Sequence, residues 1–356
     1  MRISVIGTGN GGQAIAGWLA IEGYDVCLYG RNRDTVAQLS ELGRIRLQGA
    51  VEGTGRIKVV TDDIFEAVAN ADIIMVVTTA NAHAGIARQI AGILADGQTV
   101  ILNPGRTGGA LEFRRTLEEY GCRSRVYIAE AQTLVYACRL VETGLVEIIG
   151  VKDKVLLSAI PASDTDIVLS KITPAYPCFC AASNVLRTSL ENIGAMFHPC
   201  VLLFNAATVE RRDEFWFYRD MTPKIAAFIE QFDRERLMVG EAYGIKLLSV
   251  NEWISYAYPG TSGYTLCEKM VNNPAYWNIK SPSTIFTRQL TEDIPTGVLP
   301  MLELGNAAGV ELPLMRSMVD ICGGLLGIDF CKEGRTLKRL GLAGMDKHEI
   351  IEYLSR

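Results

Sequence analysis

The chain has 356 residues, too many for one ordinary hydrophobic core, and this length predicts two domains. Its formal net charge of −5 and the absence of an apolar run near ~20 residues argue against binding to nucleic acid or to a membrane. Nine cysteines without a Cys-x-x-Cys pair and three scattered histidines predict reduced thiols and no metal site.

The first predicted element is a buried strand at Arg2–Ile6, which leads into a glycine-rich turn and then a helix near Gly11–Glu22. Because the strand begins at the N-terminus, it leaves no room for a signal peptide, and we expect a cytoplasmic protein. Gly7 allows a tight turn, Gly9 lets a pyrophosphate approach the backbone, and Gly12 lets the helix pack on the strand. The turn therefore predicts a dinucleotide site formed by Gly7, Gly9, Asn10, Gly11 and Gly12.

Up to about residue 150, short apolar runs alternate with helical patterns, as expected for a parallel sheet built from βαβ units. Further strands are predicted at Asp25–Tyr29, Ile57–Val60, Ile73–Val77, Thr99–Leu102 and Arg125–Ile128, and further helices at Thr35–Leu42, Ala82–Leu94 and Ala110–Glu119. Leu145–Gly150 and Lys154–Ala159 are predicted to form a late hairpin that completes the sheet with antiparallel strands.

From about Ser183 the pattern is helical, and prolines interrupt the preceding stretch Pro174–Ala182. We therefore expect an α/β Rossmann-type N-terminal domain at residues 1–178, with a mostly parallel sheet and late antiparallel strands. An all-α C-terminal domain that binds the substrate and carries the catalytic groups is expected at residues 179–356.

The end of the second predicted strand bears on the choice of nicotinamide cofactor. An acidic residue that would bind the ribose hydroxyls of NAD is missing there, and Arg31, Asn32 and Arg33 follow the strand instead. Guanidinium groups bind phosphate in a bidentate fashion, so these residues favour the 2′-phosphate of NADP(H). The alternative is a solvated loop in which Asp34 binds the ribose and NAD(H) is used.

Two further predicted strands end at the edge where open α/β sheets bind their ligands. Thr78 follows one of them, and Asn103, Pro104 and Gly105 follow the next. We expect these residues to contact the nicotinamide side of the cofactor. A purely structural turn is the alternative for the second segment.

Reduction of a carbonyl or imine needs a proton donor near the reacting atom, and His198 is the best candidate. It lies in a mostly apolar helical stretch, directly before Pro199, and no lysine occurs between Ser183 and Arg212 to act in its place. A buried core histidine without a chemical role is the alternative reading of the same pattern.

The chain resembles the opine dehydrogenases almost from end to end, in particular the bacterial N-(1-carboxyethyl)-norvaline type. The ordered segments that carry the resemblance are Gly7–Gly12, Ile101–Gly105, Thr107–Phe113, Asn184–Leu186, His198–Pro199, Asn273–Tyr276, Glu292–Gly297 and Lys332–Leu337. One departure is the Gly30-Arg31 sequence, which resembles the members that use NADP, whereas the norvaline type carries an acid there and uses NAD.

The resemblance implies that the substrate binds in a cleft between the two domains, where His198 and Asp293 form a catalytic dyad. From the residues alone, Asp293 could equally belong to a loop or a helix cap, and Glu292 is an equal candidate for the carboxylate. Family members condense the amine of an amino acid with a 2-keto acid and reduce the resulting imine with NAD(P)H. The two substrate carboxylates need cationic partners, for which we expect Arg288 first and Arg106 second, with Asn192 also placed in the substrate site. The expected assembly is a homodimer.

Two other functions compete with this one. A ketopantoate-reductase-like enzyme would act on a 2-keto or 2-hydroxy acid without an amine, and a sensor would bind NADP(H) without turnover. The identity of the amino acid and keto acid and the physiological direction of the reaction are not readable from the sequence.

Overall fold

The computed structural model describes residues 1–355, and the chain divides into two compact units between Ser189 and Leu190. The first unit comprises Met1–Ser189 and the chain from Glu352 onward, and the second comprises Leu190–Ile351. This division lies after the expected limit at residue 178, because strand β12 (Phe179–Ala181) and helix α7 (Val185–Ser189) still contact the sheet of the first unit.

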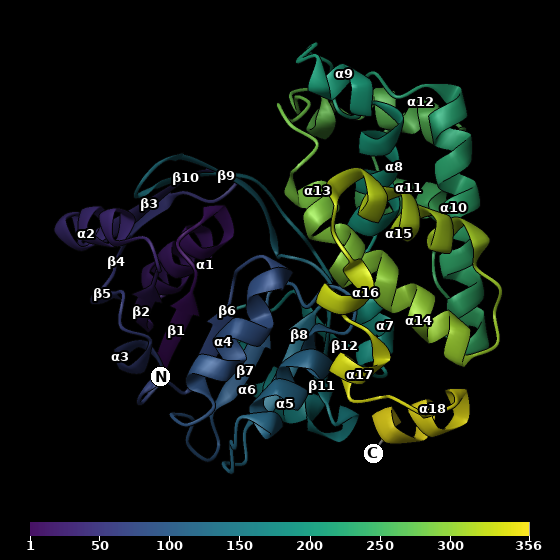
Figure 1. The fold of residues 1–356 in the computed structure, drawn as a ribbon. Helices are drawn as coiled ribbons and strands as arrows, with labels where there is room; N and C mark the ends of the chain where they lie inside the picture. Colours follow the sequence, from purple (N-terminus) through teal and green to yellow (C-terminus); the bar gives the residue numbers. More distant parts are fainter. Residues whose placement is uncertain (356) are drawn as a thin grey trace. The chain divides into compact units, whose positions relative to one another are not determined.

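An eight-stranded sheet forms the centre of the first unit (Figure 1), with the strand order β12-β11-β8-β7-β6-β1-β2-β5. Its remaining strands are β1 (Arg2–Ile6), β2 (Asp25–Tyr29), β5 (Val59–Thr61), β6 (Ile73–Val76), β7 (Thr99–Leu102), β8 (Tyr127–Ala131) and β11 (Val155–Ile160). The six strands from β5 to β8 are parallel, and β11 pairs antiparallel to β8. The predicted Rossmann-type sheet with a late antiparallel strand is therefore confirmed.

The predicted hairpin of Leu145–Gly150 with Lys154–Ala159 is wrong. These segments belong to two different sheets: β11 joins the large sheet, whereas β10 (Leu145–Val151) lies in a second sheet with the order β4-β3-β10-β9. The other strands of this small sheet are β3 (Arg44–Gly49), β4 (Gly53–Arg56) and β9 (Tyr136–Glu142). The hairpin partner of β10 is the preceding β9, because their antiparallel pairing buries Val146 and Ile148 on the inner face.

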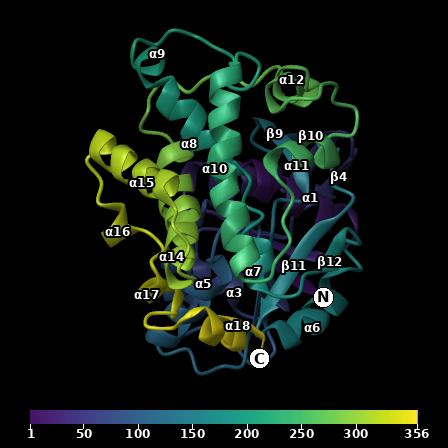
Figure 2. The same cartoon turned by 90° about the vertical axis from the view of Figure 1, so that its right-hand side faces the viewer.

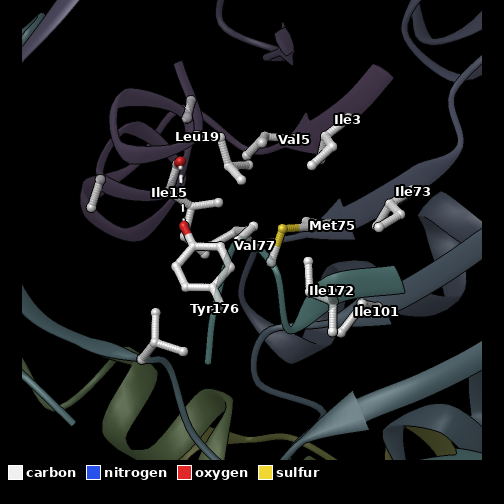
Figure 3. Packing of buried hydrophobic residues seen from close by; sticks show 14 of the residues in the cluster. Ile3, Val5, Ile15, Leu19, Ile73, Met75, Val77, Ile101, Ile172 and Tyr176 are labelled. Atoms are coloured by element: carbon white, nitrogen blue, oxygen red, sulfur yellow. Dashed lines mark hydrogen bonds between the residues drawn. The ribbon is translucent and has the colours of Figure 1, made fainter. Parts of the chain in front are cut away.

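Helix α1 (Asn10–Ile21) contacts strands of both sheets, and its apolar residues complete the core of the first unit. Figure 3 shows Ile15 and Leu19 of this helix beside Val5 of β1 and Met75 of β6, all of them fully buried. The Tyr176 hydroxyl donates to the Ile15 carbonyl at 3.5 Å. The remaining short helices of this unit are α2 (Arg33–Leu42), α3 (Ile64–Val68), η1 (Ala80–Ala82), α4 (His83–Ile90), α5 (Gly109–Glu119), η2 (Ala162–Asp164) and α6 (Thr165–Ile172).

The second unit is helical, as predicted, and among residues 190–355 the only β pairing is an isolated bridge between Trp216 and Lys280. Its long helix α10 (Pro223–Ala242) packs against α8, α14 and α15 (Figure 2). The helices are α8 (Gly194–Phe204), α9 (Ala206–Glu210), α11 (Val250–Ala257), α12 (Leu266–Val271), η3 (Pro274–Tyr276), α13 (Arg288–Thr291), η4 (Ile294–Val298), α14 (Leu299–Ala307), α15 (Pro313–Leu326), α16 (Phe330–Glu333), α17 (Leu337–Leu340) and α18 (Lys347–Ser355). Within residues 1–355, none of the helices combines the length and apolar character needed to cross a membrane.

Candidate active site

The glycine-rich turn after β1 has a backbone that only glycine fits at two positions. Gly7 has a φ of +128°, and a methyl group on it would lie 2.3 Å from the carbonyl oxygen of Val77. A methyl group on Gly12 would lie 1.8 Å from the carbonyl oxygen of Gly7, so α1 could not pack this closely on the strand. Above Gly9, by contrast, there is open space.

The N-terminus of α1 suits an anion. Gly9 is its N-cap residue, so no side chain caps the helix, and the first turn, which begins at Asn10, holds no acidic residue. Backbone N–H groups at the start of a helix carry partial positive charge and bind phosphate groups. The turn lies where the strand order reverses between β1 and β6, at the carboxyl end of both strands, and Thr78 follows β6 at the same edge. These features fit the pyrophosphate of a dinucleotide.

The segment after β7 reaches the same edge of the sheet. The Asn103 N–H donates to the Val76 carbonyl at 2.8 Å, and the Asn103 side chain donates to Ile101 at 3.0 Å. The Asn103 Oδ1 atom is buried without a hydrogen-bond partner among the described residues, so this acceptor is available to a ligand donor. Pro104 follows, and Gly105 lies so close to Glu130 that a methyl group on it would be 2.5 Å from the carboxylate.

The three residues after β2 differ in what they can offer a ligand. The Asn32 side chain caps α2, accepting from the Thr35 N–H at 2.9 Å. Arg33 pairs with Asp62, with 2.9 Å between Nε and Oδ2. Arg31 is exposed and forms no ion pair with another residue of the described chain, so it is the cation most available to a 2′-phosphate.

Within the second unit, the structure brings together His198 and Asp293, which are 95 positions apart in the sequence. The His198 Nδ1 atom lies 2.6 Å from Asp293 Oδ2, a short hydrogen bond of the charge-assisted kind. The Asp293 side chain is fully buried, whereas the His198 side chain keeps 15% of its surface exposed. With Nδ1 used by the carboxylate, Nε2 is the ring nitrogen left to contact a substrate.

Local sequence explains how each partner is presented. His198 lies on α8, whose Pro199 removes one N–H from the helical ladder beside the imidazole. Asp293 lies at the start of η4, a single turn of π-helix between α13 and α14. Phe217 and Tyr218 pack beside the His198 ring, with centroids 6.1 Å and 6.4 Å away. The ring therefore meets a carboxylate on one side and aromatic surface on others.

The predicted substrate-binding residues fall in different places. Arg288, with 56% of its side chain exposed, lies one helical turn before Glu292, and the nearest atoms of the pair are 3.8 Å apart. Asn192 is buried in the same unit, where a methyl group on Gly297 would lie 3.0 Å from its Nδ2 atom. Arg106 belongs to the first unit and has a φ of +61°, in the loop after β7.

One buried side chain that sequence reasoning missed holds the nucleotide turn in place. The Gln13 amide is fully buried, donates to the Thr8 carbonyl at 2.8 Å and accepts from the Gly144 N–H at 2.9 Å. It thus links the glycine-rich turn to the connection between β9 and β10. A polar residue on the apolar face of α1 was the available signal.

Comparisons with known proteins match both units. A family described as "NAD/NADP octopine/nopaline dehydrogenase, alpha-helical domain" matches residues 181–326, and one described as "NAD-dependent glycerol-3-phosphate dehydrogenase N-terminus" matches residues 2–105. The chain is 38% identical over 344 residues to an opine dehydrogenase from Arthrobacter sp. (strain 1C), covering 96% of this chain and 95% of that protein. The chain belongs to the opine dehydrogenase family.

Membership makes this opine dehydrogenase an oxidoreductase that uses a pyridine nucleotide and acts on CH–NH groups. Its fold is that of solved octopine dehydrogenases. A structure named with NADH and L-arginine has a TM-score of 0.82 at 22% identity, covering 99% of this chain and 98% of that one. Another, named with NADH and pyruvate, has a TM-score of 0.78 at 22% identity and covers 96% of this chain and 95% of that one.

Proposed function

We propose that this opine dehydrogenase joins the amine of an amino acid to a 2-keto acid and reduces the product with NADPH, using His198 and Asp293 as an acid/base dyad. The observation that carries the proposal is the 2.6 Å contact between the imidazole and a fully buried carboxylate. In support, the relatives named above include an opine dehydrogenase and octopine dehydrogenase structures named with L-arginine and with pyruvate.

The dyad supplies the proton that the condensation requires. The amine adds to the keto carbon, and the keto oxygen must then leave as water, which needs protonation of that oxygen. His198 donates this proton from Nε2, while Asp293 holds the ring in the required tautomer and stabilises the imidazolium form. When bound, the reduced nicotinamide supplies the hydride that converts the resulting C=N bond to a secondary amine.

We assign nucleotide binding to the N-terminal domain, and substrate binding and the dyad to the C-terminal domain. Residues 1–178 bind the nucleotide through Gly7, Gly9, Asn10, Gly11, Gly12, Thr78 and the segment Asn103–Gly105, and residues 179–356 bind the substrate and supply the dyad. Arg31 gives the preference for NADPH, because it is exposed and without an ion-pair partner in the described chain, whereas Arg33 is engaged by Asp62. We further propose a cytoplasmic homodimer, whose assembly sedimentation velocity would test.

Substrate carboxylates need cations that are not fully neutralised. Arg288 fits this role because its side chain is more than half exposed and its distance to Glu292 is long for an ion pair. Arg106 and Asn192 complete the proposed set of substrate-binding residues. A screen of amino acids with pyruvate and longer keto acids, followed by cofactor absorbance, would identify the substrates.

The decisive experiment compares NADPH oxidation with a keto acid in the presence and absence of amino acids. Amine-dependent turnover is expected, and its loss in His198→Asn but not in the exposed control His348→Asn would support the dyad. Turnover without an amine would favour a reductase of the ketopantoate type. Full amine-dependent activity in His198→Asn would exclude the proposed acid.

A further inference from the structure

Asp293 is followed directly by the π-helical turn η4, and its carboxylate contacts His198. In η4 the Leu299 N–H donates to the Ile294 carbonyl, five residues earlier, rather than to the Pro295 carbonyl as in an α-helix. Such turns are rare and are found frequently at functional sites. The conformation of η4 therefore needs an explanation from the residues around it.

The Pro295 carbonyl cannot find a partner in its own helix. The N–H four residues later, on Leu299, is already used, and the residue five positions later is Pro300, which has no N–H. Because this segment is buried, an unpartnered carbonyl there would be costly. The backbone N–H of Arg335 supplies the missing bond, at 2.9 Å, from a distant part of the sequence.

Gly334 makes this approach possible. It ends α16, with its N–H donating to the Phe330 carbonyl at 2.8 Å. A methyl group on Gly334 would lie 2.7 Å from the Phe330 carbonyl oxygen, 3.0 Å from the Pro295 carbonyl oxygen and 2.5 Å from Leu299. Two of these contacts are with backbone atoms, which cannot rotate away, so a larger residue would push the segment off η4.

The opposite side of η4 rests on the helix that carries His198. A methyl group on Gly297 would lie 2.6 Å from the Ala195 Cβ atom of α8, so the two backbones are in close contact. On its other side, the segment beyond Arg335 is tied to α14, because the Leu337 N–H donates to Glu303 at 3.2 Å. Figure 1 shows α16 and α17, in yellow, at this end of the chain.

We propose that the backbone of Gly334 and Arg335 is a clamp that holds η4 against α8 and so positions Asp293 for His198. The inference rests on the proposed dyad. It gives a role in the reaction to the segment Lys332–Leu337, through the hydrogen bond from the Arg335 N–H to the Pro295 carbonyl. Gly334 and Arg335 are positioning residues, since they act through Asp293.

The test is Gly334→Ala, with Gly324→Ala in α15 as the matched control. Gly324 has open space where a methyl group would lie, so its variant adds the same atoms without displacing anything. A displacement of about 1 Å in a catalytic group can lower the rate roughly 100-fold, and we expect a fall in kcat of this order for Gly334→Ala. The affinity for NADPH, measured by fluorescence, should be unchanged in both variants, because the nucleotide turn belongs to the first unit.

A spectroscopic readout distinguishes positioning from general damage. The chain has three histidines, so the low-field imidazole N–H proton of the His198–Asp293 bond can be assigned by replacing each in turn. We expect this resonance to move or vanish in Gly334→Ala and to stay in place in Gly324→Ala. If Gly334→Ala does not fold, Pro300→Ala replaces it, because this variant offers the Pro295 carbonyl an N–H within its own helix and should also move the resonance.

The outcomes separate the clamp from the dyad. If His198→Asn loses activity but Gly334→Ala matches Gly324→Ala in kcat and in the N–H resonance, the clamp is refuted and the dyad stands. If His198→Asn keeps its activity, the dyad itself is wrong, whatever Gly334→Ala does. A lower kcat with a shifted resonance and unchanged NADPH affinity supports both.

Discussion

Replacement of Asp293 by asparagine isolates the charge of the dyad from its shape. The carboxylate is fully buried and 2.6 Å from His198, so solvent screens the pair little. Unit charges about 4 Å apart attract by about 4 kcal/mol at an effective dielectric constant near 20. At the transition state the His198 imidazolium has transferred about half of its proton, so relative to the neutral ring Asp293→Asn would lose roughly half of this attraction. About 2 kcal/mol corresponds to a roughly 30-fold fall in kcat for Asp293→Asn.

The assay is steady-state NADPH oxidation with the best amino acid and keto acid pair, beside Glu292→Gln as control. Glu292 is the neighbouring buried carboxylate, it lies 3.8 Å from Arg288, and we propose no proton transfer at it, so its charge should contribute less to the chemistry. We expect Glu292→Gln to lose far less activity than Asp293→Asn. Equal activities in the two variants, or a greater loss in Glu292→Gln, would refute the assignment of Asp293.

Three further predictions test other parts of the structure. Arg31→Asp should weaken NADPH binding by about 1.5 to 3 kcal/mol, with little effect on NADH, whereas Arg33→Asp should change NADPH binding less; titration of cofactor fluorescence would show both. Gln13→Leu should lower the free energy of unfolding by about 2 kcal/mol in urea titrations, because it leaves two partly buried backbone groups without partners, and an unchanged midpoint would contradict this. Burial lowers the pKa of Lys152, whose ammonium group donates to the Leu134 carbonyl, from 10.5 to about 8. Between these two pKa values only the unfolded chain keeps the proton on Lys152. The free energy of unfolding of the native enzyme, compared with that of Lys152→Met, should therefore rise with pH. Urea titrations at pH 8 and above pH 10 should show a rise of at most about 3 kcal/mol. A pH-independent difference would show that Lys152 titrates normally.

The first unit shows where sequence patterns succeed and where they fail. The β1 strand, its glycine turn and α1 were predictable because the turn, the helix start and the buried strand are consecutive in the sequence. The Leu145–Gly150 strand was also located, but its partner was not. Register and pairing depend on which face of a strand is buried, and the choice of β9 over β11 is made by packing against α1.

The sequence by itself determined the residue types of this enzyme: a glycine-rich turn for a nucleotide, arginine in place of an acid after β2, and His198 in a helical stretch, 183–212, without lysine. Tertiary structure alone decided the distances. Asp293 reaches His198 across 95 positions of sequence, and the turn that carries it takes a hydrogen bond from Arg335. Local sequence patterns do not predict such contacts. The hydrogen-bond partners of the buried Asp293 carboxylate and of the Pro295 carbonyl come from segments that are distant in sequence and meet only when the helices pack.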